Sequence, residues 1–107
     1  MKIIYSAITW VDEKKEMGND YIKWLEKEHL PELFLQPGFI SVRRVKLEQK
    51  DKNNWQGYQI IMEVKNKGYL DRYIKSDSRK KAFHKIEEFN NVHYAERFFG
   101  EVDIYLK

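Results

Sequence analysis

The residue with the clearest chemical potential in this sequence is His29, because an imidazole can accept or release a proton near neutral pH. Ile22 and Leu25 precede it at helical spacing, which predicts that the three side chains share one buried face, with Trp24 beside them. Pro31 follows two residues later and cannot donate a backbone hydrogen bond. Two interpretations follow: a general acid or base at a cavity wall, or a structural histidine bonded to a carbonyl that Pro31 leaves free.

Aromatic side chains are abundant enough to form a binding pocket. They make up 15% of the chain, more surface than the core of so short a protein requires. Tyr5, Tyr58 and Tyr73 can supply hydroxyl groups to a cavity beside His29, and Trp24 can supply a wall. These residues predict a site for a small apolar or aromatic organic molecule, although tyrosines in such positions also serve simply as packing.

Metal and cofactor sites are not indicated. Glu26 and His29 form one Glu-x-x-His pair, but a di-iron carboxylate site requires two such pairs with further carboxylates, and His84 and His93 match no zinc spacing. The sequence also has no phosphate-binding glycine loop and no nucleophilic serine elbow. We therefore expect chemistry that needs neither metal nor cofactor.

Composition favours a single soluble domain over residues 1–107. The chain has no cysteine, which excludes thiol catalysis and agrees with a reducing, cytoplasmic compartment. No apolar run is long enough to span a membrane, and the first residues enter a strand pattern rather than a signal peptide. Twenty basic residues are interleaved with 17 acidic ones, giving a net charge of +3. This mixture predicts a solvated surface rather than a nucleic-acid interface.

The order of the expected elements is βαββαβ. Strand patterns cover residues 3–11, 39–47, 55–64 and 92–106, with Gly100 as a bulge in the last strand. Residues 18–20 are expected to cap a helix that runs to about residue 36 and is interrupted at Pro31. The second helical region is expected to divide at residues 76–78 into two consecutive helices. This order predicts an α+β fold of ferredoxin-like topology with a four-stranded antiparallel sheet.

The sheet is expected to need a partner. Its strands carry apolar side chains on both alternating faces, whereas the helices of one chain can cover only one face. A second copy of the chain can cover the other, so we expect a homodimer that pairs through the sheet face.

Parts of the sequence resemble a known group of proteins. The segment 24–31 (WLEKEHLP), followed by Pro37, Gly38 and Phe39, is similar to the passage from the first helix to the second strand in the dimeric α+β barrel superfamily. That group includes EthD-like proteins, antibiotic-biosynthesis monooxygenases and a related bacterial family of unknown function. The resemblance implies two sheets packed across a two-fold axis, with a cavity in each subunit. Some members are cofactor-independent oxygenases, isomerases or cyclases, and others have no known activity.

Three functions remain open at this point. The first is a small-molecule-binding protein that acts as a cofactor-independent enzyme with His29 as acid or base. The second is a ligand-sensing or stress-related interaction module that uses the same cavity without catalysis. The third is RNA binding, because the RNA-recognition motif shares the βαββαβ order, but residues 56–63 (QGYQIIME) keep only one of that motif's stacking aromatics on this strand. We expect no nucleic-acid partner and no membrane partner.

Overall fold

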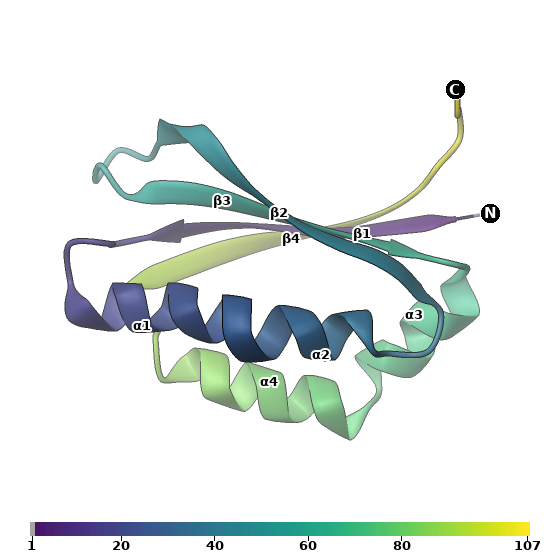
Figure 1. Ribbon diagram of the computed structural model, residues 1–107, viewed down its shortest axis with the longest axis horizontal. Coiled ribbons are helices and arrows are strands. Elements are labelled where there is room, and N and C mark those ends of the chain that lie inside the picture. Colours follow the sequence, from purple (N-terminus) through teal and green to yellow (C-terminus); the bar gives the residue numbers. More distant parts are fainter. Residues whose placement is uncertain (1) are drawn as a thin grey trace.

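The computed structural model describes residues 2–107, in which an antiparallel four-stranded sheet has the spatial order β2-β3-β1-β4. All the helices lie against one face of this sheet, and the other face is open (Figure 1). The strands are β1 (Ile3–Val11), β2 (Phe39–Lys50), β3 (Gln56–Val64) and β4 (His93–Glu101). The helical segments are α1 (Glu16–Trp24), the π-helical turn η1 (Leu25–His29), α2 (Leu30–Phe34), α3 (Lys67–Ile74) and α4 (Asp77–Glu87). The predicted α+β, ferredoxin-like fold is confirmed.

The last strand is shorter than predicted. It ends at Glu101, which pairs with Ile3, the first residue of β1. Beyond this point the amide of Val102 still donates to the carbonyl oxygen of Lys2 at 3.0 Å, but residues 103–106 leave the sheet although their pattern is typical of a strand. The bulge predicted at Gly100 is also wrong, because Gly100 pairs with Ile4 in an unbroken register.

The first helical region begins earlier than predicted and contains an unusual turn. Its first residue is Glu16, and its N-cap is Lys15 rather than residues 18–20. At the centre, the amide of Leu30 donates to the carbonyl of Leu25, five residues earlier, which is the pattern of a π-helix. Pro31 then lies in the first turn of α2, where a missing amide costs least. The predicted interruption is therefore present, as a widened turn that precedes the proline.

The second helical region divides where the sequence predicts. The helix α3 ends at Ile74 and α4 begins at Asp77, with Ser76 between them as an N-cap. The hydroxyl oxygen of Ser76 accepts a hydrogen bond from the amide of Arg79 at 3.2 Å. The apolar side chains Phe83 and Ile86 of α4 lie beside side chains of β1 and β4.

The core lies between the sheet and the helices. The side chains that face the helices from β1 and β3 alternate with those on the open face, and the most deeply buried include Val11, Val64 and Leu25. Tyr5, Tyr58 and Tyr73 are each no more than 5% exposed and belong to this core. Among residues 2–107, no helix is long and apolar enough to cross a membrane.

A tight turn before β2 gives a first testable prediction. Gly38 has a φ of +82°, and a β-carbon at this position would lie 2.2 Å from the ring of Tyr69. We expect Gly38→Ala to lower the free energy of unfolding by about 2 kcal/mol or more, through backbone strain and overlap. Gly68→Ala is the control, because the nearest atom to its new β-carbon is Asn66 Oδ1 at 3.2 Å and Gly68 is helical. Urea denaturation of both variants measures the difference, and equal stabilities would contradict the prediction.

Candidate functional site

A small cavity lies between the sheet and the helical layer. Its volume is about 30 Å³, enough for roughly one or two water molecules. The sheet contributes Tyr5, Thr9 and Arg97 to its wall, and the helices contribute His29 and Tyr73. Apolar side chains from both layers complete the enclosure. Basic, phenolic and imidazole groups therefore converge on one mostly apolar hollow.

His29 lies at the wall of this cavity, at the end of the π-helical turn. Its ring stacks on the indole of Trp24, with 4.9 Å between ring centroids and 7° between the planes. No hydrogen bond to its imidazole is present among residues 2–107, whereas the imidazole of His93 lies 2.7 Å from the carbonyl oxygen of Phe89. The structure thus shows no bond to a carbonyl freed by Pro31, and the imidazole nitrogens of His29 are available to a ligand.

The protonation of His29 follows from its surroundings. Burial, and then the positive charge of Arg97, lower the pKa of His29 from 6.5 to about 4. The ring is therefore neutral at pH 7 and can accept a proton or a hydrogen bond. Because a base with so low a pKa is weak, any group that it deprotonates has to be acidic already.

Tyr5 and Tyr73 share the cavity with His29, as the sequence predicts for these two residues. Burial raises the pKa of Tyr73, and the nearby hydroxyl of Tyr5 adds to this effect. The hydroxyl of Tyr73 is therefore protonated at neutral pH, and a phenol hydroxyl can donate a hydrogen bond to a bound molecule. Thr9 and Tyr21 also line the cavity, and their hydroxyl groups are joined by a 3.1 Å hydrogen bond.

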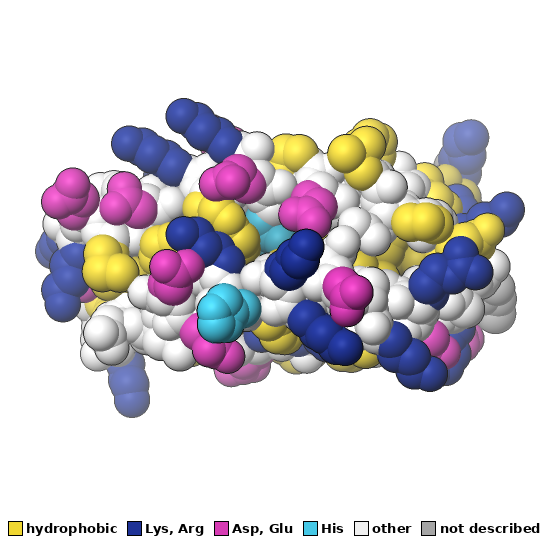
Figure 2. Space-filling view, turned by 90° about the horizontal axis from the view of Figure 1, so that it is seen from below, with side chains coloured by type: hydrophobic (Ala, Val, Ile, Leu, Met, Phe, Trp, Pro, Cys, Tyr) yellow, Lys and Arg dark blue, Asp and Glu magenta, His cyan; other side chains and the backbone are white. Residues whose placement is uncertain are grey.

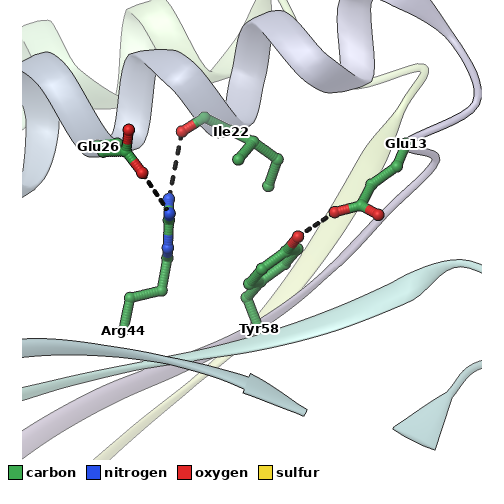
Figure 3. A network of polar contacts seen from close by, with 5 residues as sticks. All are labelled: Glu13, Ile22, Glu26, Arg44 and Tyr58. Atoms are coloured by element: carbon green, nitrogen blue, oxygen red, sulfur yellow. Dashed lines mark hydrogen bonds and ion pairs between the residues drawn. The ribbon is translucent and has the colours of Figure 1, made fainter. Parts of the chain in front are cut away.

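Trp24 and Tyr58 do not line this cavity. The indole of Trp24 stacks on the ring of His29. It also lines a surface groove together with Lys23 and Lys85. Tyr58 faces the helices near the other end of the layer, where its hydroxyl donates to the carboxylate of Glu13 (Figure 3). The structure therefore brings together three of the five residues predicted for the site.

The region around Tyr58 is a structural bridge between the sheet and α1. Arg44 lies on β2, and its side chain points toward α1 (Figure 3). Its guanidinium group donates to the carbonyl oxygen of Ile22 at 3.2 Å and forms an ion pair with Glu26 at 2.7 Å. Its guanidinium group also lies 5.5 Å from the ring centroid of Tyr58. Glu26 of the Glu-x-x-His pair is therefore engaged by Arg44 in this bridge, whereas His29 lies at the cavity wall. Among residues 2–107, no group of three His, Cys, Asp or Glu side chains is placed to hold a metal ion.

The bridge gives a second prediction. Tyr58→Phe removes the hydrogen bond to Glu13 and is expected to lower the free energy of unfolding by about 1 kcal/mol. Affinity for a ligand of the cavity should not change, because Tyr58 lies outside it. Thermal denaturation and ligand titration measure the two effects, with Tyr105→Phe at an exposed position as the control. A large loss of ligand affinity in Tyr58→Phe would contradict this placement.

Arg97 is a site residue that the sequence reasoning missed. It alternates with Ala95 and Phe99 on the helix-facing side of β4, where an apolar residue is expected. In the sequence, this site could have been recognised from a basic residue at a strand position where the alternation predicts an apolar one. Elsewhere on the helical face, basic and acidic side chains are mixed and do not gather into one block (Figure 2).

Comparison with known proteins agrees with this fold. A family model described as a domain of unknown function, DUF4286, matches residues 2–99. No curated protein matches the chain.

Solved structures give the same result at low sequence identity. An EthD family protein from Bacillus halodurans is 12% identical, with a TM-score of 0.68, 95% of this chain covered and 99% of the other. A Deinococcus radiodurans protein provisionally named an antibiotic biosynthesis monooxygenase is 12% identical, with a TM-score of 0.72 and coverages of 100% and 97%. A variant of SnoaB, a cofactor-independent oxygenase from Streptomyces nogalater, is 14% identical, with a TM-score of 0.67 and coverages of 98% and 96%. At these identities the similarity establishes the fold alone.

Proposed function

The chain belongs to the DUF4286 family, whose domain is of unknown function, and we propose that it binds a small apolar or aromatic molecule in the cavity beside His29. We propose further that it acts on this molecule without a cofactor. The observation that carries the proposal is a neutral imidazole that makes no hydrogen bond within residues 2–107 and is held at a cavity wall by a π-helical turn. Such turns occur frequently at functional sites.

The low pKa of His29 restricts the reaction. Its imidazole would take a proton from an acidic group, such as a phenol or a carbon between two carbonyl groups, while the hydroxyls of Tyr5 and Tyr73 donate to the oxygen that becomes negative. If the reaction is an oxygenation, the resulting carbanion reduces molecular oxygen directly and bonds to it as a peroxide anion. This anion takes back the proton held by the imidazole, and loss of water by cleavage of the O–O bond leaves a new carbonyl group, so that the substrate supplies all the electrons. A fold shared with a protein named a cofactor-independent oxygenase supports this proposal.

The volume of the cavity limits the ligand. About 30 Å³ is far below the roughly 300–1,000 Å³ of sites that enclose drug-sized molecules. A single ring therefore requires the helical layer to move away from the sheet, and larger ring systems require a larger movement. Ligands with one ring are accordingly the first to test.

The test combines binding and turnover. A panel of one-ring phenols and enolisable ketones is screened by thermal shift, and each compound that binds is incubated with protein while oxygen uptake and product formation are followed. We expect at least one compound to raise the melting temperature and to be converted. If compounds bind and none is converted, the second candidate, a ligand-sensing module, replaces the enzyme. If no compound of this class binds, the proposal fails.

The open face of the sheet is the proposed site of dimerisation. Ile61 on β3 and Phe98 on β4 both pair with Ser6 of β1, and all three residues face away from the helices. Phe98 is 48% exposed, and Val45 on β2 is 42% exposed on the same face. A face of an antiparallel sheet that exposes several large apolar side chains is commonly covered. We propose that a second copy of the chain covers it.

A further inference from the structure

Two arginine side chains meet at one aromatic ring beside the cavity. The guanidinium carbon of Arg79, on α4, lies 4.2 Å from the ring centroid of Phe83, and that of Arg97, on β4, lies 4.6 Å from the same centroid. Arg97 and Phe83 both line the cavity. Arg97 therefore places a positive charge on the cavity wall, and the positive charge of Arg79 lies beside the same aromatic ring.

Neither charge has a partner within the described chain. Among residues 2–107, no ion pair includes Arg79 or Arg97, whereas Arg44 is paired with Glu26. The Nε atom of Arg79 is fully buried and has no hydrogen-bond acceptor. An unsatisfied charged donor inside a protein is costly, so such groups are normally paired with an anion.

The other groups around the cavity do not supply the missing negative charge. His29 is neutral at pH 7, and the raised pKa of Tyr73 keeps its hydroxyl protonated. The negative charge of Glu32 helps to raise the pKa of Tyr73, but Glu32 is exposed and makes no ion pair with either arginine. The cavity is therefore electropositive.

We propose that the guanidinium groups of Arg79 and Arg97 bind the carboxylate of a small organic acid, with the hydroxyl of Tyr73 as a further donor. This inference rests on the proposed ligand site and names its ligand class. A carboxylate suits both the fork of N–H donors on arginine and a cavity of about 30 Å³. The apolar walls at Leu25 and Ile86 favour an acid with a hydrocarbon body.

Benzoate and benzamide provide the direct test, because they have nearly the same shape and differ in charge. Binding to the full chain is measured by calorimetry and thermal shift at pH 7.5, with ionic strength held constant by sodium chloride in both arms. We expect benzoate to bind about tenfold or more tightly than benzamide, as charge-assisted hydrogen bonds predict. Equal affinities, or no binding of benzoate, would overturn the inference.

Three variants locate the effect. Arg79→Gln and Arg97→Gln should each abolish the preference for benzoate, and their unliganded forms should melt no lower than the unmodified protein, because each loses an unpaired charge. Arg72→Gln is the matched control, since Arg72 also lies over an aromatic ring, 5.7 Å from the centroid of Tyr69, but on the exposed side of α3. An equal loss of benzoate binding in Arg72→Gln would show nonspecific charge attraction and overturn the inference.

A spectroscopic readout separates this inference from the proposed reaction. Because the charge of Arg97 contributes to the low pKa of His29, benzoate binding and the Arg97→Gln substitution should both raise that pKa in an NMR titration. If benzoate raises it and no compound is ever converted, the anion site stands and the proposed enzyme fails. If neutral ring compounds are bound and converted while benzoate has no effect on His29, the enzyme stands and the anion site fails.

Discussion

Replacement of His29 with Gln is expected to abolish turnover of any compound that the protein converts, with a loss of at least about 100-fold in kcat/KM, because glutamine keeps polarity but cannot take a proton. Binding of the same compound should change much less, and the melting temperature at pH 7.5 should stay close to that of the unmodified protein, since the imidazole makes no hydrogen bond to the described chain. Steady-state kinetics and thermal shift measure the two effects. His84→Gln, at an exposed position on α4, is the control.

The outcome distinguishes a catalytic from a structural histidine. If His29 only fills space beside Trp24, the substitution should lower stability and leave the specific activity of the folded protein unchanged. Activity retained in His29→Gln would therefore remove this residue from the proposed reaction.

The pH dependence of stability gives an independent check on His29. The unfolded chain releases this proton near pH 6.5, and the folded chain releases it near pH 4, so the unfolded state binds more protons between these values. The free energy of unfolding should accordingly fall as the pH is lowered from 6.5 to 4. The pKa shift from 6.5 to about 4 corresponds to roughly 3 kcal/mol, and solvent at the partly exposed ring reduces the contribution of His29 to about 2 kcal/mol. In urea denaturation across this range, the free energy of unfolding of His29→Gln should decline less than that of the unmodified protein. Some decline should remain, because burial also lowers the pKa of His93.

A charge on the open sheet face is expected to separate the proposed dimer. The unmodified chain should be a dimer at micromolar concentration in native mass spectrometry and light scattering. Ile61→Asp and Phe98→Asp should each give a monomer, because an unpaired carboxylate at the centre of an apolar interface costs several kcal/mol. Both side chains face away from the helical layer, so the folded monomer can keep the new charge in water.

Leu35→Asp is the matched control for this experiment. Like Phe98, Leu35 is an exposed apolar residue, at 80% exposure. Unlike Phe98, it lies at the end of α2 in the helical layer. The Leu35→Asp substitution should therefore leave the dimer intact. A stable monomer formed by the unmodified chain at micromolar concentration would contradict the proposed pairing, and so would dimers that persist in both sheet variants.

Local patterns in the sequence determined most of the secondary structure. Alternating β-branched and aromatic residues specify β1 at Ile3–Val11, because that period places side chains on both faces of a strand. Ser76 specifies the division between α3 and α4 through a hydrogen bond that spans only three residues. Pro31 specifies an interruption of the first helix, since the missing amide is a property of the residue itself. The position of His29 at the cavity follows from its helical phase with Leu25.

Only the tertiary structure decided which distant side chains meet. The end of β4 at Glu101 depends on where β1 begins, and Tyr58 belongs to the Arg44 bridge because of the register between β2 and β3. Arg79 and Arg97 lie on different elements, and they meet at Phe83 only because α4 docks across β4. Strand register and helix docking are set by the packing of the whole core, so a local pattern carries no direct signal of them. The electropositive cavity wall is therefore a property of the fold rather than of any sequence motif.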